Sequence, residues 1–323
     1  MAWSLTQIVS AVATVFFASV AAAQVYPAKP ITLIVPFPPG ASSDGIARIV
    51  GRELSQALGQ PVVVENKPGA GGALGLMMVA NAPADGYTIG LGATGAIAVG
   101  PHLPDAPALK PQQDLMPLAK LADIPLVFVT SSSSGYGNLQ AFINAARRSN
   151  SGLTYANPGQ YTAQHLSGEL LANMTGVRLL PVPYRGSGLA VTDLLGGIVT
   201  AAMLDLTSAY PHVKSGKLVA LGITSSERSK VAPELPTLAE EGVKGYAAPA
   251  WMGLFLAAKT PRDVHAKLSG ALEKIMASTS VQTQIQALAA EPAYLDGPAF
   301  GQFIANESKK WGAVIARLPK ASN

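Results

Sequence analysis

The chain has no cysteine and few charged residues. The lack of cysteine excludes disulfide bonds, cysteine-ligated zinc and thiol catalysis. Asp, Glu, Lys and Arg make up 13% of the 323 residues, about half the usual share. The formal net charge is +4, but the only adjacent basic pairs are Arg147-Arg148 and Lys309-Lys310. Nucleic-acid binding normally requires a clustered basic surface, so we expect no nucleic-acid partner.

The sequence also lacks the short motifs of the common catalytic and metal sites. It has no Walker A motif, no G-x-S-x-G elbow and no H-E-x-x-H pair, and its four histidines lack metal-ligand spacing. Gly90–Gly95 matches G-x-G-x-x-G, but four prolines between 101 and 111 stand where a dinucleotide-binding unit needs its helix. We therefore expect a binding protein with no cofactor, no metal and no catalytic residues. An active centre assembled from distant residues is the alternative.

Long apolar runs are absent apart from one at the N-terminus. Residues 8–20 are mainly apolar and are followed by Ala21-Ala22-Ala23, a small-residue cleavage signal. The stretch from 8 to 23 has 16 residues, fewer than the roughly 20 that span a bilayer. We predict a signal peptide over 1–23, cleaved near Ala23, and export to the periplasm. Because Met1–Gln7 has no Lys or Arg, an uncleaved anchor helix is the alternative.

The rest of the chain contains enough apolar sequence, 49% overall, for two domains. Strand-like runs alternate with helical periodicity, which is typical of α/β proteins with largely parallel sheets. The predicted strands are 31–37, 61–66, 87–93, 124–131, 153–157, 179–184, 199–205, 218–225 and 251–257. The predicted helices are one that begins at 42–44 and ends before 59, then 138–148, 161–174, 187–195, 262–278, 281–290 and 298–316.

The order of these elements predicts two lobes joined by strands rather than by a flexible linker. We expect the chain to cross between the lobes near 121–125 and again near 225–230. The first lobe would then consist of 24–122 plus 229–323, and the second lobe of 123–228.

The most informative feature is a repeated corner, in which a strand ends, a turn of small residues follows and a helix begins. Corners of this kind lie at 37–44, 155–162, 183–188 and 92–95. Unpaired N–H groups at a helix start, beside the positive end of the dipole, form a seat for an anion. Ligands of open α/β sheets bind at the carboxyl ends of strands, where all four corners lie. The predicted site residues are Phe37, Pro39, Gly40, Ala41, Ser42, Ser43, Asp44, Thr94, Asn157, Gly159, Tyr161, Thr162, His165, Tyr184, Arg185, Gly186 and Ser187.

Each corner also has a purely structural interpretation. The hydroxyl and carboxyl groups at the helix starts could cap their helices without touching a ligand. Asp44 is expected to hold its loop, because an acid in direct contact with a bound anion would repel it. Arg185 could pair with the anion or be solvated, and His165 could contact the ligand or only pack within its helix.

Several segments of the chain occur together, and in this order, in one protein family. They are Phe37–Arg48, Val64–Gly72, Ala84–Thr88, Val182–Ser187, Lys214–Leu218, Leu235–Gly242 and the strand that begins at Trp251. On these motifs the sequence resembles, over nearly all of the mature chain, the extracytoplasmic solute receptors of tripartite tricarboxylate transporters, also called Bug proteins. The resemblance implies a two-lobed periplasmic binding-protein fold of the type II-like class. Each lobe would have a mainly parallel sheet flanked by helices, with the ligand cleft between the lobes.

The resemblance also implies which residues hold the ligand. One side of the cleft would be the corner Phe37–Asp44 and the opposite side Arg185–Ser187, with one carboxylate of the ligand at Gly159–Thr162. Asp205 matches a frequent pocket-lining position. The family usually has Gly-Gly where this chain has Gly40-Ala41, so the methyl group of Ala41 is expected to narrow the pocket or alter the loop.

These observations lead to one leading hypothesis and two alternatives. The leading hypothesis is a monomeric periplasmic receptor that binds a small organic carboxylate, a dicarboxylate or an aromatic acid, for the membrane permease subunits of a tripartite transporter. The first alternative is a sensor that presents the bound acid to a signalling partner. The second is an enzyme on the same scaffold.

Overall fold

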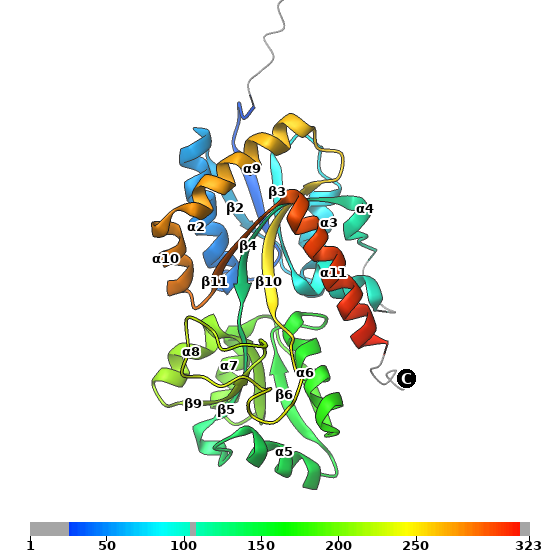
Figure 1. Ribbon diagram of the computed structural model, residues 1–323, viewed down its shortest axis with the longest axis vertical. Coiled ribbons are helices and arrows are strands. Elements are labelled where there is room, and N and C mark those ends of the chain that lie inside the picture. Colours follow the sequence, from blue (N-terminus) through cyan, green and yellow to red (C-terminus); the bar gives the residue numbers. More distant parts are fainter. Residues whose placement is uncertain (1–25, 104–107, 317–323) are drawn as a thin grey trace, which may run out of the picture.

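Two lobes, stacked along the long axis of the molecule, make up the fold (Figure 1). The computed structural model describes residues 26–103 and 108–316. The predicted signal peptide, 1–23, lies outside these residues. Within the described ranges no helix has the length and apolar character needed to cross a membrane.

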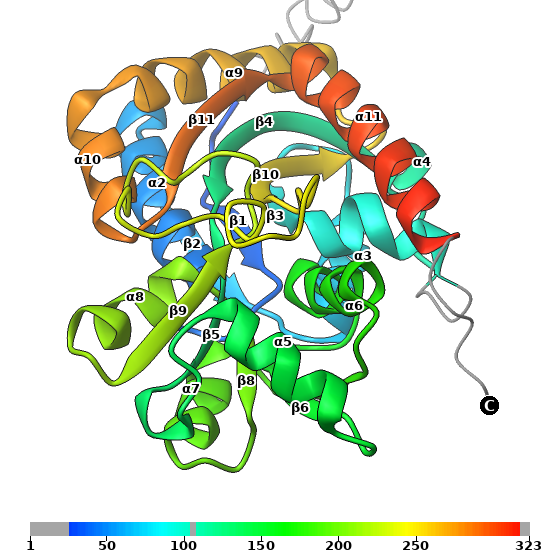
Figure 2. The same cartoon turned by 60° about the horizontal axis from the view of Figure 1, so that its bottom comes forward.

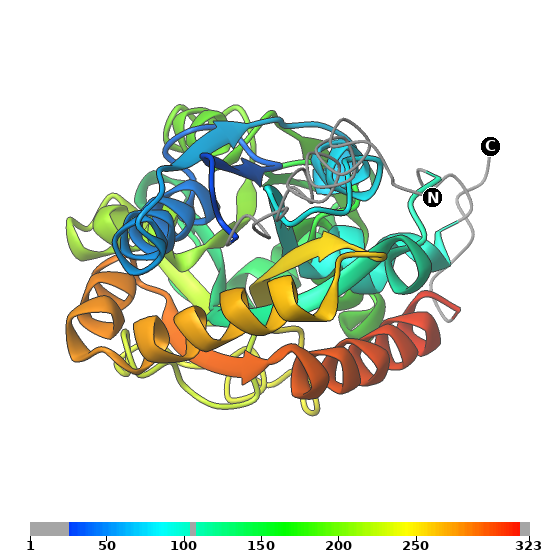
Figure 3. The same ribbon diagram turned by 90° about the horizontal axis from the view of Figure 1, so that it is seen from above.

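The first lobe has, among the described residues, a six-stranded sheet with helices on both faces. Its strands are β1 Ile31–Val35, β2 Val62–Asn66, β3 Thr88–Ala93, β4 Leu115–Ile124, β10 Ala250–Ala257 and β11 Glu291–Asp296. Its helices and short helical turns are α2 Ser42–Leu58, η1 Ala70–Gly72, α3 Ala73–Ala80, η2 Gly95–Val99, η3 Gly100–His102, α4 Pro111–Asp114, α9 Arg262–Ala277, α10 Thr279–Ala287 and α11 Gly297–Ile315. The strand order is β11-β4-β10-β3-β1-β2. Helices α2, α9 and α10 cover one face and α3 and α11 the other; Figure 3 shows β11 beside α9 and α10.

The second lobe has, in the same described part of the chain, a five-stranded sheet in the order β7-β6-β8-β5-β9. Its strands are β5 Leu126–Ser131, β6 Leu153–Asn157, β7 Leu179–Pro183, β8 Ala201–Asp205 and β9 Leu218–Ile223. Its helices are η4 Ser132–Ser134, α5 Leu139–Arg148, α6 Ala163–Thr175, α7 Ser187–Leu195 and α8 Leu206–Lys214. Helix α6 packs on one face of this sheet, and α7 and α8 pack on the other (Figure 2).

The two-lobed α/β fold is confirmed, and in each sheet most strands run in one direction, with β10 and β11 reversed in the first sheet and β5 reversed in the second. β1 is parallel to β2 and β3, and β6 is parallel to β7 and β8. β10 is antiparallel to β3 and β4, and β5 is antiparallel to β8 and β9. The reason is that β5 and β10 each begin where the chain enters a lobe. They run away from the gap between the lobes, against strands whose carboxyl ends point into it.

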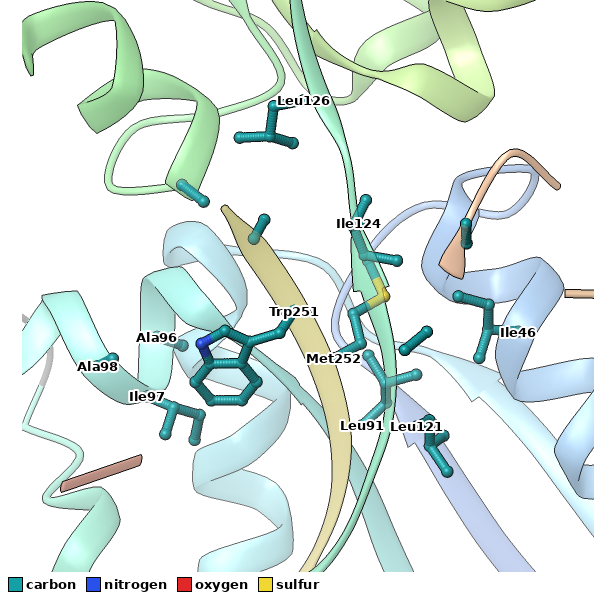
Figure 4. Packing of buried hydrophobic residues seen from close by; sticks show 14 of the residues in the cluster. Ile46, Leu91, Ala96, Ile97, Ala98, Leu121, Ile124, Leu126, Trp251 and Met252 are labelled. Atoms are coloured by element: carbon teal, nitrogen blue, oxygen red, sulfur yellow. The ribbon is translucent and has the colours of Figure 1, made fainter. Parts of the chain in front are cut away.

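The first crossing between the lobes is Pro125, which separates β4 of the first sheet from β5 of the second. Its carbonyl oxygen accepts a hydrogen bond from the N–H of Leu206, at 2.9 Å. The second crossing precedes β10, where Ala250 pairs with Ile124. Figure 4 shows Trp251 and Met252 on β10 beside the strand that carries Ile124. The two crossing segments therefore lie next to each other.

The division into 24–122 plus 229–323 and 123–228 stays a prediction. The long segment between β9 and β10 contacts both lobes. Ser229 donates to Glu291 of β11, at 2.6 Å, whereas the carbonyl oxygen of Glu241 accepts from Gln140 of α5, at 2.7 Å.

The sequence patterns miss the strands β4 and β11 and the helices α3, α4 and α8, besides the short helical turns. β4 contains Pro117 and Lys120, which do not fit a buried strand. The structure buries Lys120 because its ammonium pairs with Asp123, at 2.6 Å, and lies 4.3 Å from the ring centre of Phe303. Similarly, α8 contains Pro211 inside the helix. Packing against neighbouring elements overrides the local sequence in these places.

Gly253 of β10 allows a close approach of aromatic side chains. Trp251 contacts Phe300 and Phe303 edge to face, with ring centres 5.3 and 5.5 Å apart. A Cβ atom on Gly253 would lie 2.4 Å from Cζ of Phe300 and 2.7 Å from the carbonyl oxygen of Ala119. This tight packing fixes the strand that carries Trp251 into the site.

We expect Gly253→Ala to lower the free energy of unfolding by about 2 kcal/mol, because an extra methyl group in a filled core forces its neighbours apart. Urea denaturation measures this change. Gly270→Ala in α9 is the matched control, since nothing lies within 4 Å of its added Cβ atom. Equal stability of the two variants would contradict the close packing around β10.

Candidate functional site

The first corner links β1 to α2 through a turn that needs one glycine. Gly40 has a φ of +81°, which L-residues with a side chain rarely adopt. Ala41, by contrast, has a φ of −72° and fits the loop without strain. Ala41 belongs to the lining of a pocket between the lobes. The departure from Gly-Gly therefore causes no backbone strain, and that its methyl group narrows the pocket stays a prediction.

Asp44 holds this loop in place. Its carboxylate accepts from the N–H of Gly40 (3.1 Å), from the Arg48 guanidinium (3.0 Å) and from the amide of Asn66 (2.9 Å). Burial alone raises the pKa of Asp44. The hydrogen bonds from Arg48, Asn66 and Gly40, together with the Arg48 charge, outweigh burial and lower this pKa below its usual value. The loop that starts α2 is therefore tied down by an ionised carboxylate.

The second corner, between β6 and α6, is held by three side chains. Asn157 is fully buried and accepts from the N–H of Gly159, at 3.1 Å. Thr162 caps α6, because its hydroxyl accepts from the N–H of His165 and donates to the carbonyl of Gly159. Burial lowers the pKa of His165 to about 4, so the neutral ring can accept at Nδ1 from the N–H of Tyr161, at 3.2 Å. Tyr161 has a positive φ of 65°, a strained conformation that this bond supports.

The third corner, between β7 and α7, is not capped by a side chain. Gly186 is the N-cap of α7, and no side-chain hydrogen bond caps this helix. The same holds for α2, whose N-cap is Ala41. Within the described residues the hydroxyls of Ser43 and Ser187 have no hydrogen-bond partner, although both residues are buried. The capping interpretation thus holds for Thr162 and fails for these two serines.

One hydrogen bond in this region joins the two lobes directly. The Ser42 hydroxyl donates to Oδ2 of Asp205, at 2.7 Å, and both residues are almost fully buried. The helix start at Ser42 is therefore connected to the end of β8.

The fourth corner is fixed to β10, because the Thr94 hydroxyl accepts from the N–H of Trp251 at 2.9 Å.

These corners enclose two adjacent pockets between the lobes. The inner pocket has a volume of about 50 Å³, and the outer pocket about 620 Å³. Six residues line both: Phe37, Pro38, Gly71, Pro158, Thr162 and Gly186. The inner pocket is also reached by Trp251, the first large side chain of β10. The site thus has a narrow inner end and a wide outer part.

Three helix starts meet at the inner pocket. They are the N-termini of α2, at Ala41 to Ser43, of α6, at Thr162 to Gln164, and of α7, at Gly186 and Ser187. The first N–H groups of each helix have no partner within the helix and carry part of its positive dipole end. The inner lining contains no Lys, Arg or His, and Asp205 is its one charged residue within the described chain. Any attraction for an anion at this end therefore comes from backbone dipoles and hydroxyls.

Thirteen of the predicted site residues line at least one of the two pockets. They are Phe37, Ala41, Ser42, Ser43, Thr94, Gly159, Tyr161, Thr162, Tyr184, Arg185, Gly186, Ser187 and Asp205. Arg185 is exposed and lies at the outer pocket. Tyr184 is oriented there by its hydroxyl, which donates to Asp193 at 2.7 Å.

The other five predicted residues, Pro39, Gly40, Asp44, Asn157 and His165, do not line either pocket. Pro39 and Gly40 are exposed parts of the turn. The remaining three hold the first two corners through the hydrogen bonds described above. They affect the pocket only through the loops that they hold in place.

The pockets also contain residues that sequence reasoning did not select. The segment 68–72 lines the outer pocket and lies after β2, so its strand-turn-helix pattern could have identified it as a further corner. Gly71 and Gly95 have a different role. A Cβ atom on Gly71 would lie 2.9 Å from the carbonyl oxygen of Gln160, and one on Gly95 would lie 2.6 Å from that of Tyr161. These glycines allow the lobes to approach, and no local sequence signal identifies such contacts.

Known proteins resemble the chain over most of its length. Residues 46–319 match the model of the tripartite tricarboxylate transporter family receptor. Protein BugT of Bordetella pertussis is 37% identical over 305 residues, which cover 94% of each chain. A protein encoded in the tcbD-tcbE intergenic region of Pseudomonas sp. is 36% identical over 299 residues, 92% of this chain and 89% of the relative.

Solved structures show the same fold. The periplasmic binding protein BugD has a TM-score of 0.83 at 32% identity, with 90% of this chain and 98% of BugD covered. MatC from Rhodopseudomonas palustris with bound malate has a TM-score of 0.82 at 31% identity, covering 90% of this chain and 100% of MatC. A further R. palustris protein, solved with adipate, has a TM-score of 0.86 at 29% identity, covering 90% and 97%.

We expect Asp44→Asn to lower the free energy of unfolding by about 1 kcal/mol at pH 7, because the charged partner of Arg48 is lost. The folded pKa of Asp44 lies below its unfolded value of about 3.9. The stabilisation is therefore fully present above that pH and is lost as the pH falls through the folded pKa. Urea denaturation between pH 7 and pH 3 should show the two proteins converging below about pH 4. A constant difference down to pH 3, or an equal effect of Asp263→Asn at an exposed acid, would contradict this role.

Proposed function

Because the chain belongs to the receptor family of the tripartite tricarboxylate transporters, we propose that it captures a small organic carboxylate in the periplasm and presents it to membrane permease subunits. The observation that carries the proposal is the meeting of three helix N-termini at one pocket between the lobes. Export through a signal peptide cleaved near Ala23, and action as a monomer, belong to the same proposal. Binding, and no chemical conversion, is the proposed activity.

Backbone N–H groups suit a carboxylate better than a neutral sugar or a cationic amine. Each helix start offers N–H donors beside a positive partial charge of about half an elementary charge. A hydrogen bond to a charged group contributes roughly 1.5–3 kcal/mol. Four to six such bonds exceed the roughly 8 kcal/mol of micromolar binding, which leaves a surplus for ordering the ligand and closing the lobes.

The sizes of the two pockets indicate how the ligand would lie. The inner pocket, about 50 Å³, has room for one carboxylate group, and the outer pocket, about 620 Å³, takes the rest of the molecule. Phe37 and Tyr161 line the outer part and can cover a carbon skeleton, and Arg185 at the mouth can attract a second carboxylate. A dicarboxylate or an aromatic acid fits this arrangement. The relatives with malate and with adipate bind acids of the first kind.

A screen of small acids by thermal shift and calorimetry tests the proposal. We expect at least one mono-, di- or aromatic carboxylate to raise the melting temperature and to bind with a Kd in the micromolar range or below. The reason is that the inner pocket offers backbone N–H and hydroxyl donors to a carboxylate. Neutral sugars and cationic amines of similar size serve as controls. Binding of only those controls would reject the proposed function.

Ser43→Ala and Ser187→Ala test the two helix starts separately. Each variant should raise the Kd for the acid found in the screen by about 5-fold or more, since each removes one hydroxyl donor to a charged ligand. The melting temperature of the unliganded protein should stay nearly unchanged, because neither hydroxyl makes a hydrogen bond to another residue in the described part of the chain. Ser55→Ala, about three turns further along α2, is the matched control. An equal loss of unliganded stability with no change in Kd would show that both serines serve the fold alone.

A further inference from the structure

Asp205 is an acid in a pocket otherwise built for an anion. It is the last residue of β8, it is 3% exposed, and it belongs to the lining of the inner pocket. It participates in none of the ion pairs found among the described residues. Nor does it act as a helix cap, since its side chain makes no hydrogen bond to the start of α8. Its place in the pocket therefore needs another explanation.

The Asp205 carboxylate has unused capacity to accept hydrogen bonds. Its Oδ2 atom accepts from the Ser42 hydroxyl, and its Oδ1 atom is buried without a partner in the described protein. An ionised carboxylate can accept about four hydrogen bonds. A buried acceptor left unpaired is costly, and more so when it is charged. A donor that enters the inner pocket would remove this cost.

A ligand carboxylate cannot supply that donor. Two ionised carboxylates in one small pocket repel each other. The ligand must therefore turn a different group toward Asp205. A hydroxyl or an ammonium group close to the carboxylate carries the required proton.

We propose that Asp205 selects carboxylates that also carry a hydrogen-bond donor, a hydroxyl or an ammonium group, next to the carboxylate bound at the helix starts. This proposal rests on the function proposed above and narrows its ligand class to hydroxy acids or amino acids. Ser42 is a positioning residue in this arrangement, because its hydroxyl orients Asp205 across the gap between the lobes. The Asp205 oxygens recognise the donor, and the helix N-termini recognise the acid.

The test uses acids that differ by one donor. Succinate, malate and aspartate share four carbons and two carboxylates and carry no donor, a hydroxyl and an ammonium group respectively. Glutarate with 2-hydroxyglutarate, and phenylacetate with mandelate, extend the comparison in length and to an aromatic acid. In each series that binds, calorimetry should show the donor-bearing acid binding about 10-fold or more tightly than the donor-free one. Malate against aspartate then shows which donor the pocket prefers.

Asp205→Asn should reduce this preference to about 3-fold or less, because the amide is a weaker acceptor and offers a donor of its own to the donor-free acids. Asp263→Asn, at an exposed acid of α9, removes the same charge far from the pocket and should keep the wild-type values. Ser42→Ala retains the Asp205 carboxylate but no longer orients it, so it should weaken the donor-bearing acids more than the donor-free ones and reduce the preference without abolishing it. Ser42→Ala and the wild-type series test whether Asp205 recognises the donor of the ligand, even if Asp205→Asn does not fold.

Two results would overturn the inference while leaving the proposed function intact. One is that wild-type protein binds succinate, or another donor-free acid, as tightly as its donor-bearing partner. The other is that Asp205→Asn weakens all acids by the same factor, which would make Asp205 only a link between the lobes. If no carboxylate of the wider screen binds, the proposed function fails and this inference fails with it.

Discussion

The whole site depends on strands from two separate sheets that end at the same gap. β1 and β3 of the first lobe, and β6, β7 and β8 of the second, point their carboxyl ends toward it. The helices that follow β1, β6 and β7 must therefore begin there. Their first N–H groups cannot be paired within the helix. The convergence of three helix starts is thus a consequence of topology, and it supplies a positive potential without a basic side chain.

Hydrogen bonds from side chains outside the pocket lining hold these helix starts in place. On the first lobe the ionised Asp44 ties the loop to Arg48 and Asn66, and on the second lobe the neutral His165 supports the strained backbone at Tyr161. Donors that are already in place lose little entropy when a ligand arrives. The glycines at the contact, Gly71 and Gly95, let the two rigid sides come close enough to share one ligand. The small residues at the contact and the loops held by Asp44 and His165 therefore both help the two lobes to share one ligand.

Much of the fold and of the pocket could be predicted because the signals are local. The turn before Ser42 and the turn before Ser187 each follow an apolar strand and precede an amphipathic helix, and both lie in the pocket. The resemblance to the receptor family is confirmed by the match over 46–319. Strand β4 escaped prediction because the burial of its Lys120 depends on the ring of Phe303, in the distant helix α11, as well as on the ion pair with Asp123. Asn157 and His165 belong to a corner that lines the pocket, but their side chains point into supporting hydrogen bonds, which no sequence pattern distinguishes.

The sequence by itself determined the family, the two-lobed α/β architecture and the positions of the corners, because a strand end, a flexible turn and a helix start are encoded in consecutive residues. The tertiary structure decided which hydroxyls cap a helix, as at Thr162, and which stay free toward the pocket, as at Ser43 and Ser187. It also decided the partner of Asp205. The hydrogen bond from Ser42 to Asp205 joins residues 163 positions apart. Such a contact depends on how two lobes pack, and packing involves the whole chain at once.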